Sequence, residues 1–361
     1  PPPPPPPPPA FFPPKTAYEI SLGLVGSEMC IRDRVLGFET SCDETSVSIL
    51  RGNEVLVNLI SSQVDQHKQF GGVVPEVASR AHIEKIRNLL HECLIQGNIQ
   101  PEDIDIVAAT DGPGLAGSLV VGYNFAKSFA WSLNKPFYAI DHMVGHLVAP
   151  TIDFEELKPP FLSLLVSGGH TQIVLVEDWG KYELFGQTID DAAGEAFDKL
   201  SRYCGFGFPG GPAIQKLSEN GNPNAVDLPR PSVKSTKDFS FSGLKTAAIY
   251  YLEGIDPENK IVSKEDFAAS YQEAIVDTLI RNFSLVIKET GVKTISGGGG
   301  VVANARLRQK MQSLADDKKL ACYLPSVSLS TDNAAMICAA ANMELVSTKE
   351  SKDIRLASVI K

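Results

Sequence analysis

Apolar residues in the first half of the chain occur in short runs that polar turns separate. These runs predict strands at residues 35–38, 46–50, 54–60, 104–109 and 137–140. Apolar positions at helical spacing predict a helix over residues 75–96, with Ile83 on its apolar face, and another over residues 115–133. The first strand ends in the acidic turn 39–45, and a hairpin follows where a Rossmann fold has a helix.

The second half repeats this order after Pro159-Pro160. Strands are expected at residues 161–166, 171–176, 182–188, 293–296 and 321–324. An amphipathic helix spans Phe267 to Phe283, and further helices are expected at 302–314 and 333–346. Because both halves begin with three strands around a polar turn, we predict a duplicated α/β architecture whose two lobes face each other across a cleft.

The domain organisation follows from the same pattern. Residues 1–34 open with nine prolines, which form extended polyproline II and bury nothing, so we expect a disordered, non-native extension. We expect an N-terminal lobe at residues 35–150, completed by a C-terminal helix at 333–361, and a C-terminal lobe at residues 151–332.

The composition is typical of a soluble globular protein. The 361 residues are 43% hydrophobic and 21% charged, and no apolar run approaches the roughly 20 residues of a membrane span. Six cysteines without paired spacing are typical of reduced thiols, so we expect a cytoplasmic protein. The net charge of −10 argues against non-specific nucleic-acid coating but leaves room for a local basic groove.

Two histidines four residues apart, His142 and His146, give the strongest chemical signal. On a helix they lie on one face, where two imidazoles can bind one metal ion, and a downstream aspartate would complete a two-histidine, one-carboxylate site. The alternative interpretation is a pair of surface histidines on an amphipathic turn. Asp332 precedes the last helix, and its position there is typical of an N-cap.

Three glycine-rich segments, at 112–118, 167–169 and 297–300, indicate close approach of the backbone to a ligand. Glycine lets N–H groups reach a phosphate, and helix N-termini favour anions, so together the segments predict a nucleotide or acyl-phosphate site. None of them is a Walker motif, because no Gly-Lys-Ser/Thr sequence follows.

Carboxylates gather in the first turn, where Glu39, Asp43 and Glu44 are either solvated turn residues or act in general-base or metal-linked chemistry. Asp198 in the second half is a candidate to hydrogen-bond a ribose or substrate hydroxyl. Cys42 is a poor nucleophile candidate, since nearby negative charge raises a thiol pKa. The solitary histidines are expected to be structural: His67, His82, His91 and His170.

Taken in order, these motifs resemble the TsaD family, the bacterial and mitochondrial tRNA adenosine threonylcarbamoyltransferases. The resemblance runs from Val35 to about Val346. It rests on His67 and the His142–His146 pair and on the segments GFETSCDET at 37–45, GGVVPEVASRAH at 71–82, GPGL at 112–115, LVSGGHT at 165–171, DDAAGEAFDK at 190–199, FSFSGLK at 239–245, GGVVAN at 299–304 and TDN at 331–333.

The resemblance implies an actin-like, sugar-kinase-like (ASKHA) fold of two tandem RNase H-like lobes. It implies that His142, His146 and Asp332 bind one divalent metal ion, with Fe²⁺ expected and Zn²⁺ or Mn²⁺ as alternatives. It also implies substrate contacts from Leu165, Val166, Ser167, Gly168, Gly169, Asp198, Gly211 and Asn304. Gln215 departs from the acidic residue that many members carry at this position.

The implied reaction moves a threonylcarbamoyl group from threonylcarbamoyl-AMP to the exocyclic amine of the adenosine 3′ of the anticodon, in tRNAs that read ANN codons. Asp43 and Glu44 are the candidate bases. Candidate tRNA contacts are Lys234, Lys237, Lys245, Arg306 and Arg308. The family implies a paralogous subunit (TsaB) and a small ATPase (TsaE) as partners in bacteria, or a homodimer in mitochondria, and no membrane partner.

Other functions stay open on the sequence alone. An ATPase or kinase of the same fold would not need the histidine pair. A metalloprotease, as in the family's older glycoprotease name, fits poorly, because Met143 stands where a His-Glu-x-x-His motif has its glutamate. A non-catalytic paralogue would lack the metal ligands that this chain carries.

Overall fold

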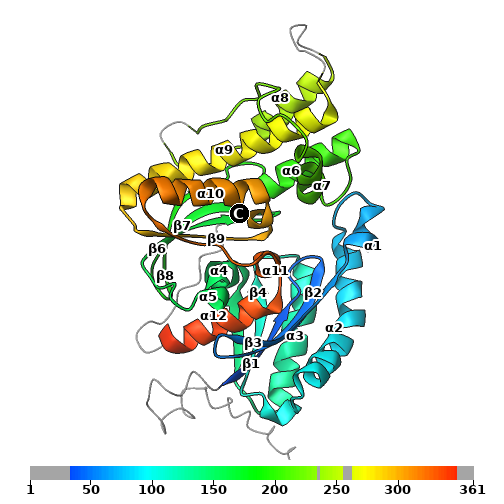
Figure 1. The fold of residues 1–361 in the computed structure, drawn as a ribbon. Helices are drawn as coiled ribbons and strands as arrows, with labels where there is room; N and C mark the ends of the chain where they lie inside the picture. The colour runs from blue at the N-terminus through cyan, green and yellow to red at the C-terminus, as the bar shows by residue number, and fades with distance from the viewer. Residues whose placement is uncertain (1–32, 234–235, 255–261, 348–361) are drawn as a thin grey trace, which may run out of the picture.

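The computed structural model describes residues 33–233, 236–254 and 262–347, which form two α/β lobes (Figure 1). Each lobe is built on one five-stranded sheet. The first sheet has the order β3-β2-β1-β4-β5 and contains β1 (Arg34–Glu39), β2 (Glu44–Arg51), β3 (Glu54–Ser62), β4 (Ile106–Gly112) and β5 (Phe137–Asp141). The second has the order β10-β9-β6-β7-β8 and contains β6 (Phe161–Val166), β7 (Thr171–Asp178), β8 (Lys181–Gln187), β9 (Thr294–Gly298) and β10 (Ala321–Tyr323).

The two sheets have the same topology. In each, the first three strands form an antiparallel meander, and the remaining two strands run parallel to the first. This repetition confirms the predicted duplicated architecture. The strand β1 begins one residue before the expected Val35, because Arg34 already pairs with Arg51 of β2, and its backbone N–H also donates to the carboxylate of Asp105 at 2.9 Å. Residues 1–32 of the expected extension lie outside the described residues.

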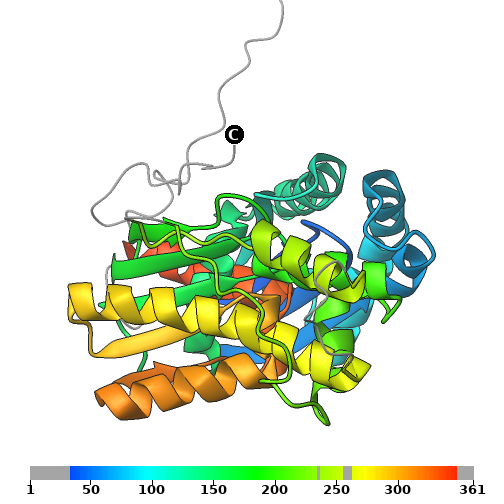
Figure 2. The same ribbon diagram turned by 90° about the horizontal axis from the view of Figure 1, so that it is seen from above.

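Helices cover both faces of the sheets. In the N-terminal lobe they are α1 (Val64–Lys68), α2 (Pro75–Gly97), η2 (Pro101–Asp103), α3 (Ala116–Ser132), α4 (His142–Val148) and α5 (Pro150–Asp153), followed late in the chain by α12 (Ala334–Ser347). The short helix α11 (Val327–Ser330) contacts residues 300–303 of the second lobe, and its Leu329 packs in the same core as α12. The second sheet is accompanied by α6 (Ala193–Cys204), α7 (Gly210–Ser218), α8 (Ser242–Leu252), α9 (Lys264–Thr290), η3 (Gly300–Ala303) and α10 (Ala305–Lys318). Helices α9 and α10 lie side by side (Figure 2).

The short helix α4 is packed between the two lobes. Its Val144 and Val148 share a core with α12, whereas Met143 and Leu147 share a different core with strand β6. Helix α4 therefore has two apolar faces, one toward each core, and a third face between them that can carry polar side chains. This placement puts the two histidines of α4 at the junction of the lobes.

Helix α12 closes the N-terminal lobe from the far end of the chain. It contacts β1 and β2, and a Cβ atom on Gly37 of β1 would lie 2.5 Å from the Cys338 sulfur. The glycine is therefore required for this close approach. The contact supports the proposed assignment of the C-terminal helix to the N-terminal lobe, although residues 348–361 of that segment lie outside the described residues.

Two predictions from the apolar pattern are wrong. Ile83 is 63% exposed, because α2 contacts the sheet through another face that includes Ala78 and Ile86. The helix expected from residue 302 begins at Ala305, because the side chain of Asn304 accepts the backbone N–H of Leu307 at 3.0 Å and caps it there. Among the residues that the structure describes, none of the helices combines the length and apolar character that a membrane span needs.

A buried polar network joins α2 to the acidic turn between β1 and β2. The Nε2 of His82 lies 3.0 Å from the carbonyl oxygen of Cys42, and its Nδ1 lies 2.8 Å from the Thr45 hydroxyl and 3.3 Å from the Gln63 amide. Gln63 also contacts the buried His67 at 3.2 Å. Since Thr45 and Gln63 can donate to Nδ1, His82 is neutral, with its proton on Nε2 toward the turn.

This network predicts a pH-dependent stability. Burial lowers the pKa of His82 from the ordinary 6.5, so between the two pKa values the unfolded chain binds a proton that the folded chain does not. The free energy of unfolding should therefore fall as the pH decreases through 6.5. His82→Gln keeps a donor for the Cys42 carbonyl. Its free energy of unfolding, measured with denaturant from about pH 7.5 to about pH 5, the range in which histidine titrates, should fall less than that of the wild type. His91→Gln, at an exposed position of the same helix, is the matched control, and an equal slope in His82→Gln and wild type would contradict the prediction.

Candidate functional site

Helix α4 holds its two histidines because its first turn is capped. The Asp141 carboxylate accepts the backbone N–H groups of Met143 at 2.8 Å and Val144 at 3.2 Å. The capped turn begins at His142, so the i and i+4 imidazoles lie on one face, as expected from their spacing. His142 is 6% exposed and His146 fully buried, which excludes the interpretation as surface histidines.

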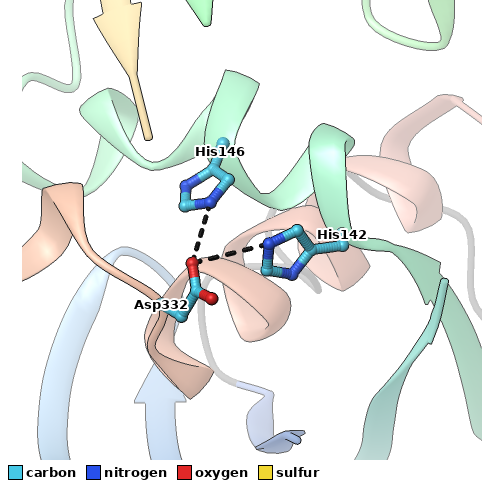
Figure 3. Close-up of side chains that lie close together, drawn as sticks. All are labelled: His142, His146 and Asp332. Atoms are coloured by element: carbon cyan, nitrogen blue, oxygen red, sulfur yellow. Dashed lines mark hydrogen bonds and ion pairs between the residues drawn. The ribbon is translucent and has the colours of Figure 1, made fainter. Parts of the chain in front are cut away.

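Asp332 approaches this face from the segment before α12 (Figure 3). The cap of α12 is Asn333, whose side chain accepts the backbone N–H of Met336 at 3.2 Å. The N-cap interpretation of Asp332 is therefore wrong by one residue. Its carboxylate is left to face the two imidazoles.

The three side chains form one cluster. The Asp332 Oδ1 lies 3.1 Å from the His146 Nε2 and 3.5 Å from the His142 Nε2. One candidate ligand atom from each residue falls within 4.8 Å of the others, the one such group of three among the described residues. Two imidazole nitrogens and one carboxylate oxygen suit a divalent transition metal, and the three donors leave further coordination positions open. The residues therefore fit a metal ion.

The charges in the cluster are strongly coupled. Burial alone would lower the pKa of His142, but the carboxylates of Glu39 and Asp332 outweigh it and raise the pKa. Burial would likewise raise the pKa of Asp332, yet the two histidines lower it well below its usual range. A metal ion would take the place of the shared protons, since it binds neutral imidazole and ionised carboxylate.

Glu39 lies behind His142 and not at the mouth of a cleft. It is fully buried at the end of β1, where its carboxylate lies 3.0 Å from the His142 Nδ1. The Thr110 hydroxyl and the Ser41 backbone N–H also donate to it, each at 2.5 Å. Glu39 therefore differs from the other two carboxylates of its turn, with which the sequence had grouped it.

Asp43 and Glu44 remain on the half-buried part of the turn. Burial, together with the neighbouring Asp43 and Asp332, raises the pKa of Glu44 to about 9. The same surroundings raise the pKa of the Cys42 thiol, which supports its exclusion as a nucleophile. A backbone hydrogen bond holds this turn against the segment before α3, since the Ser41 carbonyl accepts the Leu115 N–H at 2.7 Å.

The glycine-rich segments have different roles. In the segment 112–118, a Cβ on Gly114 would lie 2.6 Å from the Ser41 carbonyl oxygen, so this glycine permits packing under the acidic turn. By contrast, a Cβ on Gly168, Gly169 or Gly211 would meet no atom within 4 Å. The backbone at these three glycines is open to a ligand.

The segment 297–300 connects the open glycine turn with the histidine cluster. A Cβ on Gly298 would collide with the His146 carbonyl oxygen, and one on Gly299 with that of Val166. A Cβ on the next residue, Gly300, would lie 4.0 Å from the Thr331 side chain. The 165–169 turn, His146 and the segment before α12 therefore converge on the same glycines.

The other expected substrate residues surround this region. The side chains of Leu165 and Val166 are buried in the two cores, so only their backbone can meet a substrate. The Ser167 hydroxyl accepts the His170 N–H at 3.1 Å, and the Asp198 carboxylate accepts the Gly210 N–H at 2.6 Å. Burial raises the pKa of Asp198.

The start of α10 brings Gln215 and Asn304 together. The Gln215 side-chain oxygen accepts the backbone N–H of Ala305 at 2.8 Å, and the Asn304 amide donates to the buried Gln272 at 2.7 Å. Gln215 thus fixes the beginning of the helix that Asn304 caps. Sequence reasoning missed Gln272, because nothing in a helical apolar pattern marks a buried glutamine as the partner of a distant asparagine.

The candidate tRNA-binding cations have partners inside the protein. Lys237 pairs with Glu289, Lys245 with Asp191 at 2.7 Å, and Arg306 forms two hydrogen bonds of 2.7 Å with Glu273. Arg308 donates to the backbone carbonyls of Leu324 and Pro325 at 3.2 and 2.9 Å. Lys234 lies outside the described residues.

Solved structures with a similar fold support the architecture. Full-length HypF in its phosphate- and nucleotide-bound form matches 89% of the chain with a TM-score of 0.58 at 13% identity. HypF from T. kodakarensis matches with a TM-score of 0.60 at 12% identity, and the chain spans about half of the length of either HypF chain. The activator of 2-hydroxyisocaproyl-CoA dehydratase from Clostridium difficile matches along 99% of its length, with a TM-score of 0.50. The fold is the ASKHA fold.

Sequence comparison gives the family. The family model described as TsaD, tRNA N6-adenosine threonylcarbamoyltransferase, matches residues 54–339. A relative of this name from Clostridioides difficile is 48% identical over 326 residues, covering 90% of this chain and 96% of the relative. Another from Thermosipho africanus is 47% identical over 326 residues, covering 90% and 98%. The chain therefore belongs to the TsaD family of tRNA N6-adenosine threonylcarbamoyltransferases and is a transferase.

Proposed function

We propose that the chain transfers threonylcarbamoyl from threonylcarbamoyl-AMP to the exocyclic amine of the adenosine 3′ of the anticodon, in tRNAs that read ANN codons. Membership in the family supports the tRNA adenosine as acceptor. The observation that carries the proposal is the convergence of the histidine cluster and the open 168–169 glycines on the segment 297–300. The cluster that fits a metal ion and the glycines with free space beside them therefore adjoin the same segment, which supports the proposal.

In this proposal His142, His146 and Asp332 hold one divalent metal ion, with Fe²⁺ expected and Zn²⁺ or Mn²⁺ as alternatives. The bound ion supplies Lewis acidity toward the donor's carbonyl or carboxylate oxygen. AMP is already a good leaving group in a mixed carbamoyl–phosphate anhydride. The chain therefore needs mainly to hold the two substrates together, which can supply much of the rate.

The donor is placed along the open glycines. We assign the phosphate to the turn at Gly168 and Gly169, because a Cβ on either glycine would meet no protein atom within 4 Å and glycine lets backbone N–H groups approach a phosphate. Asp198 uses one carboxylate oxygen for the Gly210 N–H, and the other is left for a ribose hydroxyl. Gln215 and Asn304 act here by fixing the start of α10 beside the adenosine.

The proton of the attacking amine goes to the acidic turn. Glu44 retains its proton at neutral pH, since its pKa is raised to about 9. We therefore assign the accepting role to Asp43, with which Glu44 forms a side-chain hydrogen bond. A paralogous TsaB subunit, the TsaE ATPase or a second copy of this chain would act with it in the cytoplasm.

The first test measures transfer of labelled threonylcarbamoyl from its adenylate to an ANN-decoding tRNA transcript. His142→Ala should lower the rate by about 100-fold or more, because it removes a metal ligand. Running the assay with and without TsaB and TsaE separates the self-sufficient from the partner-dependent form. If ATP is turned over and no tRNA is modified even with partners, the ATPase or kinase alternative replaces the proposal.

A second test addresses the donor site. Gly169→Ala should leave the melting temperature unchanged, since the added Cβ meets no atom within 4 Å. It should raise the KM for threonylcarbamoyl-AMP by about tenfold, or about 1.4 kcal/mol, because the methyl group occupies the phosphate's space. Gly243→Ala, whose Cβ is equally free on α8, is the control. An unchanged KM in Gly169→Ala would place the phosphate elsewhere.

A third test addresses the tRNA contacts. Charge reversal of Lys234 and Lys237 to Glu should weaken tRNA binding and reduce the slope of log K against log salt by about one for each lost phosphate contact. Lys181→Glu, on the β7–β8 hairpin, makes half of this change of charge at another place, so it is matched to Lys237→Glu alone and should retain more of the binding than that variant. Binding that does not change in the double variant removes both lysines from the interface.

A further inference from the structure

The carboxylate of Glu39 is held in one orientation by three neighbouring groups. Its Oε1 accepts the Ser41 backbone N–H, and its Oε2 accepts the Thr110 hydroxyl and lies 3.0 Å from the His142 Nδ1. A fully buried carboxylate is tolerated only where donors surround it. Two of these contacts have fixed donors, since the Ser41 backbone N–H and the Thr110 hydroxyl both donate, and the carboxylate is the acceptor toward each.

An acceptor at this position determines the tautomer of His142. Its Nδ1 must carry the proton that faces Glu39, so the Nε2 of the neutral ring has the free lone pair. That Nε2 is the atom that faces Asp332, at 3.5 Å. The Ser41 hydroxyl, 3.3 Å from the same Nδ1, can rotate to accept or donate and does not oppose this assignment.

The other histidine lacks such support. The Nδ1 of His146 is buried and has no hydrogen-bond partner among the described residues. Glu39 is also not placed to be a ligand, since it contacts the opposite edge of the His142 ring from the one that faces Asp332. Its direct contact with a proposed metal ligand is therefore the one with His142.

We propose that Glu39 is a positioning residue that fixes the proton on the Nδ1 of His142 and thereby presents its Nε2 to a divalent metal ion. The inference rests on the metal site of the proposed function. It gives the first acidic residue of the turn a role separate from that of Asp43 and Glu44. Outer-shell partners of this kind typically change metal affinity by about 10- to 100-fold.

Glu39→Gln tests this with little change of shape. The Ser41 N–H keeps the amide oxygen of Gln on its own side, so the amide NH₂ turns toward His142. A donor there favours the opposite tautomer, with the proton on Nε2 and the lone pair away from Asp332. We expect Zn²⁺ affinity of the full chain, measured by competition with a chromophoric chelator, to fall by about 10- to 100-fold. Long-range ¹H–¹⁵N spectra of histidine-labelled protein, recorded at a pH at which the His142 ring is neutral, should show its proton move from Nδ1 to Nε2.

Two further variants keep the result interpretable. Thr110→Val removes one donor to Glu39 at nearly constant side-chain volume. It should weaken Zn²⁺ binding, but less than Glu39→Gln does. This variant provides the test if Glu39→Gln fails to fold. Asp105→Asn alters a carboxylate that accepts a backbone N–H at the opposite end of β1 and should bind Zn²⁺ as the wild type does.

Each outcome decides the inference. Wild-type affinity and an unchanged His142 tautomer in Glu39→Gln would overturn it, as would wild-type affinity in Thr110→Val if only that variant folds. Absence of stoichiometric Zn²⁺ binding by the wild type would overturn it together with the metal site. Transfer activity is measured separately, so an inactive wild type that still shows the Glu39 effect on Zn²⁺ would refute the proposed reaction and leave the inference intact.

Discussion

The structure depends on burying an alternating row of carboxylates and imidazoles, Glu39, His142, Asp332 and His146, where the two lobes meet. Charges in such a place are costly unless each has a partner of opposite sign or a hydrogen bond. The partners come from the end of β1, from α4 and from the segment before α12. Three segments that are far apart in the chain must therefore arrive together, and much of the packing around them serves that requirement.

Small residues make this approach feasible. Gly145 lies between the two histidines, and a Cβ there would come within 3.1 Å of both Met336 and Ile337 of α12. Gly37 plays the same part where α12 crosses β1, against Cys338. Asn333 caps the start of α12, and this leaves the preceding residue, Asp332, directed toward the imidazoles. A Cβ at residue 145 would therefore require the Met336 and Ile337 side chains to give by a few tenths of an ångström.

The spacing of apolar and polar residues predicted those features that depend on residues close together in the chain. The strand and helix order followed from apolar spacing, and the shared face of His142 and His146 followed from helical geometry. Spacing did not distinguish Asp332 from Asn333 as the cap of α12, since both residue types favour that position. It also placed Ile83 in the core, because periodicity gives the apolar face of a helix but not the width of the surface that covers it. The role of Glu39 needed the contact with His142, 103 residues away.

The internal pairing of the cations ranks them as tRNA contacts. The Lys237–Glu289 pair joins side chains that are 32% and 49% exposed, and such pairs contribute only about 0–1 kcal/mol, so a phosphate can replace the carboxylate at small cost. Arg306 is held by two hydrogen bonds to a Glu273 carboxylate that is only 10% exposed, and Arg308 donates to three backbone carbonyls. Moving either arginine toward a phosphate would leave poorly solvated acceptors without a donor, which costs more than an exposed pair. Of the tRNA contacts that we propose, Lys237 is therefore freer to exchange its partner for a phosphate than Arg306 or Arg308.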